Sequence, residues 1–204
     1  MLFSLDKLSI DEKKQLLGEV LIPRPIALIL TKSGEERYSL SNISFFSIAS
    51  YEPALLFFLI ERKPDGSKKQ TWLNIEERID FSLFFLNETL QQKLHSKIIS
   101  DQEEWELPQE ELNYDKKISP LPILKESYLA FFCEKYQIIE IGDIPNGLIL
   151  GKIKSIYVDN QFLENSKEIN IKNPAELRSI VKIGLNKTIS LIEIAHGVSK
   201  DPSN

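Results

Sequence analysis

The segment SLSNISFFSIASYEP, residues 39–53, combines side chains that rarely share one short stretch of chain. Five serines surround two adjacent phenylalanines, Phe45 and Phe46, and the segment contains no glycine. Serine hydroxyls and backbone amides can hydrogen-bond the carbonyls and ring nitrogens of a flat heterocycle. Aromatic rings can cover its apolar face or edge. These residue types indicate a binding site for a planar ring.

The same residues have an ordinary structural interpretation. Ser39, Ser41 and Ser44 are also typical of turns. One of Phe45 and Phe46 is expected to pack in the core, because adjacent side chains of a strand face opposite ways. Both interpretations stay open from these residues alone.

A second group of residues suits a phosphate. Arg62, Lys68 and Lys69 can form charge-assisted hydrogen bonds to an anion. Thr71 and the amides after it open a predicted short helix over 70–78, a natural anion site. A solvated loop is the alternative, since KPDGSKK is also good turn chemistry. A planar ring with a phosphate tail describes FMN.

Other site chemistry has little support in the sequence. His95 and His196 are the two histidines, and neither a GxGxxG, a P-loop nor a GxSxG motif occurs. Cys133 lies in an apolar stretch, so we expect a buried, inert thiol. Glu76 and Glu77 are adjacent and would point in different directions on a helix. We therefore predict no catalytic side chain and no metal site, and expect a cofactor to carry any chemistry.

The composition is that of an ordinary globular protein. Of 204 residues, 42% are hydrophobic and 27% charged, and the net charge of −5 makes a nucleic-acid partner unexpected. A single cysteine excludes an intrachain disulfide. The start MLFSLDKLSI lacks the pattern of a signal peptide, and no apolar run approaches the roughly 18 residues of a membrane span. We expect a cytoplasmic protein with no membrane association.

The elements that must position these residues are mostly strands. Apolar runs rich in Ile, Leu, Phe, Val and Tyr predict strands over 26–31, 54–61, 80–86, 128–141 and 148–158, the last two joined as a hairpin through 141–147. Capping residues predict helices over 9–20, 70–78, 87–98 and 173–184. The acidic stretch 101–112 is expected to lie on the surface. We predict one mainly β domain over 1–204, a barrel with a few peripheral helices and a flexible tail after about residue 197.

Three motifs in order resemble one known family. They are PRPIALI (23–29), SFFSIASYEP (44–53) and RKPDGSKKQTWLNI (62–75). The chain resembles the flavin reductase-like proteins, which include the flavoredoxins. That resemblance implies an antiparallel Greek-key split β-barrel, a homodimer, and FMN near the subunit interface.

The resemblance also implies which residues contact the flavin. Residues on the three motifs take the family's cofactor-binding positions; they are Arg24, Ser44, Phe45, Phe46, Ser47, Ser50, Arg62, Lys69 and Thr71. Two positions depart from the family pattern, because Gln70 replaces an aspartate and Ser47 replaces an asparagine.

The leading hypothesis is an NAD(P)H-dependent flavin oxidoreductase. Hydride would pass from the nicotinamide to flavin N5. The reduced flavin would then pass its electrons to an acceptor that the sequence does not identify. His196 is the first candidate for a nicotinamide contact. A flavoredoxin-like electron carrier and a flavin-binding module without turnover are the alternatives.

Overall fold

A computed structural model describes residues 2, 4–35, 37–99, 104–114, 121–163, 180–183 and 187–190. Within these residues the α-helices are α1 (Ile10–Val20), α2 (Gln70–Glu77) and α3 (Glu88–Ile99), with 3-10 turns at Leu5–Lys7, Gln109–Glu111 and Asn160–Phe162. The strands are β1 (Arg24–Pro25), β2 (Ala27–Lys32), β3 (Tyr38–Ile43), β4 (Phe46–Tyr51), β5 (Ala54–Ile60), β6 (Asp80–Phe85), β7 (Glu104–Leu107), β8 (Leu112–Asn113), β9 (Ile123–Leu124), β10 (Leu129–Ile141), β11 (Asn146–Val158), β12 (Ile180–Ile183) and β13 (Lys187–Ser190).

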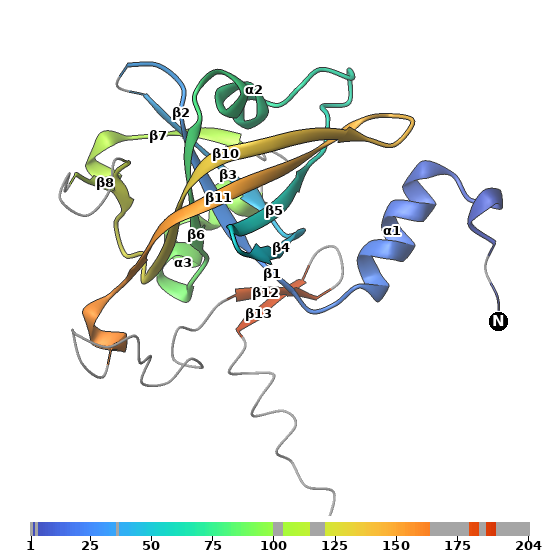
Figure 1. Cartoon of the computed structure of the whole chain (residues 1–204). Helices are drawn as coiled ribbons and strands as arrows, with labels where there is room; N and C mark the ends of the chain where they lie inside the picture. The colour runs from blue at the N-terminus through green and yellow to red at the C-terminus, as the bar shows by residue number, and fades with distance from the viewer. Residues whose placement is uncertain are drawn as a thin grey trace, which may run out of the picture.

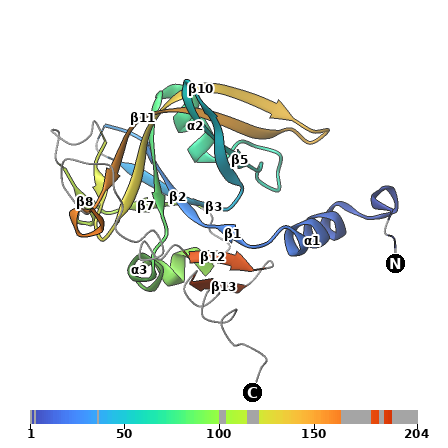
Figure 2. The same ribbon diagram turned by 60° about the horizontal axis from the view of Figure 1, so that its bottom comes forward.

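One large antiparallel sheet organises the described chain. Its strand order is β4-β5-β11-β10-β6-β2-β3-β7, so β4 and β7 lie at its two ends. The β10–β11 hairpin is its longest pair and runs across the molecule, with its turn projecting beyond β5 (Figure 1). A smaller sheet, β1-β12-β13, lies beside the start of β2 (Figure 2). The predicted mainly β fold is confirmed.

Both faces of the sheet are buried, which explains why its central strands are continuous apolar runs. On β2, Leu28 and Leu30 join a core under α3 and β7–β9, whereas Ala27 and Ile29 join a core under α2. Trp72 and Ile75 of α2 are fully buried in this second core. The helix covers one face of the strands that carry the site.

The helix α1 begins where its sequence predicts. Ser9 accepts a hydrogen bond from the Glu12 amide while the Glu12 carboxylate accepts one from the Ser9 amide, which is a complete capping box. Its apolar side chains, however, are not buried in this chain, and Leu17 and Val20 are 51% and 66% exposed. Both views show α1 standing away from the sheet (Figures 1 and 2).

Two predicted segments are corrected by the structure. The helix predicted over 173–184 is wrong in its second half, because residues 180–183 form β12 between β1 and β13. Ile-Val-Lys-Ile is rich in β-branched residues, which fit a pleated strand. Residues 173–179 and Gly184 lie outside the described residues, as do His196 and the predicted flexible tail.

The acidic stretch 101–112 is only partly a surface segment. Glu104–Leu107 forms β7, which pairs with β3 and buries Trp105 and Leu107 in the core. Among the described helices, none is long and apolar enough to cross a membrane.

Candidate functional site

The segment 39–53 forms parts of two strands rather than a loop. Residues 39–43 belong to β3, and Phe46–Tyr51 forms β4, with Ser44 and Phe45 between them. β4 pairs with β5 along one side and has no neighbour on its other side within the described sheet. A register shift between Ile48 and Ser50 bends the strand at this edge. Because β4 has no strand on this side within the described sheet, its backbone groups there are candidates for a ligand contact.

The two adjacent phenylalanines face opposite ways, as expected. Phe46 packs edge-on against Phe85, with ring centroids 5.8 Å apart, and belongs to the core under α2. Phe45 is 39% exposed, and the Arg24 guanidinium lies over its ring at 4.7 Å. Phe45 is therefore the one available to a ligand. Ser47 is exposed beside it on β4, whereas Ser44 and Ser50 are half-buried.

Arg24 links this edge to α1. Its side chain is buried and donates hydrogen bonds to the carbonyl oxygens of Gly18 at 2.6 Å and Leu21 at 3.3 Å. A cation at the C-terminal end of a helix is favoured by the helix dipole. Burial lowers the pKa of Arg24, which nevertheless remains a cation at neutral pH.

Ser41 of β3 holds α2 rather than forming a turn. Thr71 is buried on α2 and its hydroxyl donates to Ser41 Oγ at 3.0 Å. One turn further, Asn74 Nδ2 donates to Thr31 Oγ1 at 2.9 Å. These hydrogen bonds fix the start of the helix against β2 and β3. Thr71 therefore lies at the N-terminal end of α2, as predicted, and a phosphate contact by Thr71 stays a prediction.

A carboxylate that we did not predict lies at the same end of α2. Glu104 accepts hydrogen bonds from the backbone amides of Gln70 at 2.8 Å and Thr71 at 2.7 Å. The register of β7 on β3 places Glu104 opposite Ser41. The alternation in Glu-Trp-Glu-Leu is the signal of a strand that would have located it.

Lys69 precedes the helix and is half-buried. Burial is the main cause that lowers the pKa of Lys69, and the nearby carboxylates of Glu61 and Glu104 act in the opposite direction. The ammonium groups of Lys14 and Lys63 also act to lower the pKa of Lys69, and an anion in direct contact would favour its charged form. Glu61 also pairs with Lys14 of α1 at 3.0 Å.

Arg62 and Lys68 hold a different part of the structure together. Arg62 donates to the Pro145 carbonyl at 2.6 Å and to Glu140 at 2.7 Å, both at the end of the β10–β11 hairpin. Its guanidinium and the Lys68 ammonium each lie over the Trp72 ring, at 5.0 and 4.6 Å. The structure thus brings Arg62 to the hairpin turn, and a direct phosphate contact by Arg62 stays a prediction.

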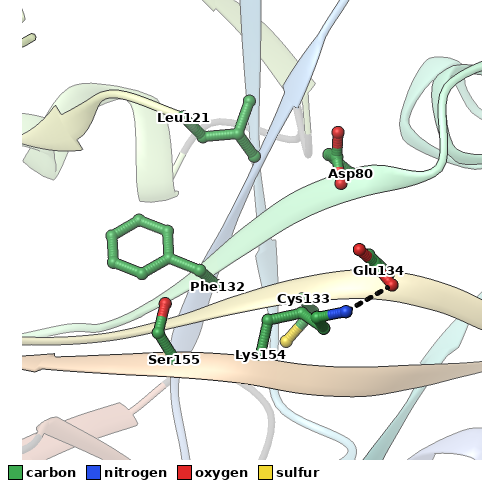
Figure 3. A pocket seen from close by; sticks show the side chains of 7 residues that line it. All are labelled: Asp80, Leu121, Phe132, Cys133, Glu134, Lys154 and Ser155. Atoms are coloured by element: carbon green, nitrogen blue, oxygen red, sulfur yellow. Dashed lines mark hydrogen bonds and ion pairs between the residues drawn. The ribbon is translucent and has the colours of Figure 1, made fainter. Parts of the chain in front are cut away.

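A small pocket elsewhere on the sheet contains none of the predicted flavin residues (Figure 3). It is lined by Asp80, Leu121, Phe132, Cys133, Glu134, Lys154 and Ser155. Glu134 and Lys154 pair with each other at 3.1 Å, and burial raises the pKa of Cys133 to about 12. The thiol is therefore unreactive at neutral pH. Across the described residues, no group of three or more potential ligands could hold a metal.

The sequence between residues 19 and 169 matches the model of the flavin reductase-like domain. The chain belongs to the flavin reductase-like family. An uncharacterized protein of Halalkalibacterium halodurans is 32% identical to it over 139 residues, which cover 67% of this chain and 66%, just under two thirds, of that relative.

Solved structures show the same fold. Nitrilotriacetate monooxygenase component B from Bacillus cereus has a TM-score of 0.78 at 22% identity, covering 94% of this chain and 95% of that one. A provisionally named flavin reductase with a split barrel domain, from Shewanella frigidimarina, has a TM-score of 0.71 at 18% identity, covering 93% and 94%. An FMN-binding protein from Thermus thermophilus has a TM-score of 0.62 at 17% identity, covering 84% and 88%. These likenesses confirm the predicted split barrel.

The flavin reductase-like chain thus offers two groups of candidate contacts joined by β3. The open edge of β4 with Phe45 and Arg24 fits a flat ring. The α2 terminus with Thr71 and Lys69 has the donors that suit an anion. Three residues of strand, about 10 Å, separate Ser41 from Ser44, a span comparable with a ribityl phosphate chain. At the anion end, however, the amides are already bonded to Glu104.

Proposed function

We propose that this chain binds FMN and catalyses oxidation of NADH or NADPH through it. The observation that carries the proposal is that one short stretch of chain, β3, leads at its end to the open edge of β4 and is bonded through Ser41 to Thr71 at the start of α2. Membership of the flavin reductase-like family supplies the ligand class. The whole chain is proposed to act as one domain.

The chain contributes binding and orientation. FMN, when bound, would supply the redox chemistry of hydride transfer from the nicotinamide. The free side of β4, which carries Ser47 and Ser50, and Ser44 just before it would hydrogen-bond the ring edge through backbone groups. Phe45, fixed by the Arg24 guanidinium, would cover an apolar part of the ring. No side chain is assigned as an acid, base or nucleophile.

The phosphate contacts are proposed at α2. The Thr71 amide and the Lys69 ammonium would hold the phosphate. Because these groups sit on a helix docked by buried hydrogen bonds to Thr31 and Ser41, they are held in place before a ligand arrives.

An absorption experiment tests the function. The purified protein, loaded with FMN if it is colourless, is mixed anaerobically with NADH or NADPH, and the flavin band is followed. Loss of the flavin absorption band after mixing supports the oxidoreductase. The nucleotide that causes the faster loss is the preferred donor. A flavin-loaded protein that keeps its colour with both donors contradicts the proposed activity and favours a carrier or binding module. A protein that does not quench the fluorescence of added FMN contradicts flavin binding itself.

A second copy of this chain is proposed as the partner of α1. The exposed apolar side chains of α1 and the residues after it are Ile10, Leu17, Val20, Leu21 and Ile22. They lie on an element that stands off the sheet (Figure 2) and is bonded to Arg24, whose guanidinium lies over Phe45, so a partner covering them would also lie near the start of β4. Closed two-fold dimers are the commonest way to bury such a surface.

A further inference from the structure

The carboxylate of Glu104 occupies the hydrogen-bond donors that the proposed function assigns to a phosphate. Each of its oxygens accepts one backbone amide of α2, Oε2 from Gln70 at 2.8 Å and Oε1 from Thr71 at 2.7 Å. Lys69, which precedes these residues, makes no side-chain cap to the helix. Glu104 therefore acts as the anion at this helix end.

The position of Glu104 is determined by the sheet. β7 pairs with β3 through four residue pairs, from Tyr38↔Leu107 to Ser41↔Glu104. Trp105 and Leu107 alternate with glutamates and anchor the strand in the core. Glu104 is the last residue of this register, directly opposite the serine that binds Thr71. Because the rest of β7 is anchored, the side chain of Glu104 can leave the helix end without loss of the strand.

A phosphate and the Glu104 carboxylate cannot both accept the Thr71 amide. Two anions in contact also repel, and the half-buried surroundings strengthen that repulsion. A flavin phosphate must therefore displace Glu104, whereas a flavin without a phosphate need not.

We infer that Glu104 is an internal competitor for the phosphate of FMN and determines how strongly this chain discriminates FMN from riboflavin. The inference rests on the proposed function. In the natural chain the phosphate contributes little net affinity, since its gain is offset by release of the carboxylate. Riboflavin, which shares the ring and ribityl chain, is then bound almost as tightly as FMN.

The ratio of the two dissociation constants tests this inference. FMN and riboflavin are titrated separately into the apoprotein, and quenching of flavin fluorescence gives both constants. Glu104→Gln removes the charge but keeps an oxygen that can accept a helix amide. Glu106→Gln is the matched control, because Glu106 lies on the same strand, is exposed and pairs with Arg37 at 3.4 Å.

Glu104→Gln is expected to tighten FMN binding by about tenfold or more, the scale of one charge-assisted contact, and to leave riboflavin binding unchanged. Glu106→Gln should leave both constants unchanged. If the ratio of the FMN and riboflavin dissociation constants is the same in the natural chain and in Glu104→Gln, the inference is overturned. The proposed function then still stands, provided that FMN binds. Absence of binding by either flavin in the natural chain overturns the proposed function, and the inference with it.

A measurement on the natural chain covers the case in which Glu104→Gln does not fold. Amide hydrogen exchange of residues 104–107 is compared in the free protein, with FMN and with riboflavin. Exchange at the start of β7 should become faster with FMN only, because the phosphate releases Glu104. Equal exchange with both flavins overturns the competition.

Discussion

Thr71 illustrates how one residue can serve both the fold and a ligand. Its hydroxyl binds Ser41 within the core, while its amide faces the anion position at the start of α2. Lys69 is the nearest charged side chain of the same segment, held half-buried at the helix N-cap. Together they offer an anion one backbone hydrogen-bond donor, the Thr71 amide, and one positive charge, the Lys69 ammonium.

Lys69→Ala in the Glu104→Gln variant, where no carboxylate competes for the helix end, should weaken FMN binding strongly. A charge-assisted hydrogen bond contributes about 1.5–3 kcal/mol, so the dissociation constant should rise by at least about tenfold relative to Glu104→Gln alone. Fluorescence titration measures it. Lys63→Ala, at an exposed turn residue, is the control in the same variant. An unchanged FMN constant would remove Lys69 from the site.

Asp80 provides a prediction about pH. Burial, followed by the facing carboxylate of Glu134, raises the pKa of Asp80, and the Lys154 ammonium partly opposes this. The folded state then holds the proton more tightly than the unfolded chain. The free energy of unfolding therefore falls as pH rises from the ordinary value of 3.8 through the raised pKa.

Asp80→Asn should consequently stabilise the protein at pH 7, by about 0.2–1 kcal/mol, the range for charge pairs across strands. The gain should vanish well below pH 3.8, where aspartate is protonated in both states. Urea unfolding at several pH values measures this difference. Asp143→Asn, at an exposed position of the hairpin turn, is the control. A gain that is equal at pH 3 and pH 7 would contradict the electrostatic cause.

At the scale of elements, β11 depends on a close approach to the core. A Cβ atom added at Gly151 would overlap the Cζ atom of Phe81, whose ring is fully buried and packs against Phe58 at 5.5 Å. The crowding involves a ring that has no room to move, so the strand itself must shift.

Gly151→Ala is therefore expected to lower the free energy of unfolding by about 1–3 kcal/mol, as overpacked cores do. Gly34→Ala is the matched control, because its added Cβ would meet only the Arg37 side chain, at 3.2 Å from Nε, which can turn away. Urea unfolding curves compare the two variants. A similar loss in both would show that the core around Phe81 is not the cause.

The elements that could be predicted are those whose signal is local. Long apolar runs at β2, β5, β6, β10 and β11, and caps such as Ser9, depend on nearby residues. The sequence does not indicate β3 and β4 as strands, because their serines obscure the apolar alternation; one of them, Ser41, is explained by its hydrogen bond with Thr71 of α2. β12 carries a helix-like pattern that is overridden by pairing with β1 and β13.

The site divides in the same way. The ring edge and the Thr71 donor lie on contiguous motifs, so the sequence indicates them together. Glu104 reaches α2 through the register of β7 on β3, and no local pattern connects residues thirty-three positions apart. Arg62 has a motif position, but its partners Pro145 and Glu140 come from a distant hairpin. The sequence therefore indicates that Arg62 occupies a motif position, but it does not indicate which distant residues Arg62 contacts.

At the scale of the whole molecule, α1 has an apolar face without cover in this chain. Leu17 and Val20 lie three positions apart on the helix, so they share one face. Leu17→Glu with Val20→Glu should convert the proposed dimer to a monomer, because charges placed in an apolar interface lose their hydration. Sedimentation velocity measures the mass in solution. Glu19→Lys, exposed on the same helix, is the charge-changing control.

If the natural protein sediments with the mass of a single chain, the proposed dimer is contradicted. A dimer that persists in the double variant would place the interface elsewhere.

The two-residue strand β1 has a consequence for how the molecule is completed during synthesis. Arg24 and Pro25 pair with Lys182 and Val181, which leave the ribosome long after them. The large sheet contains strands up to β11 only, so it can assemble co-translationally before β12 is made. The segment holding Arg24, and with it the support beneath Phe45, is then the last to be secured. We expect a nascent chain arrested before residue 180 to contain a folded barrel with an unfinished flavin edge.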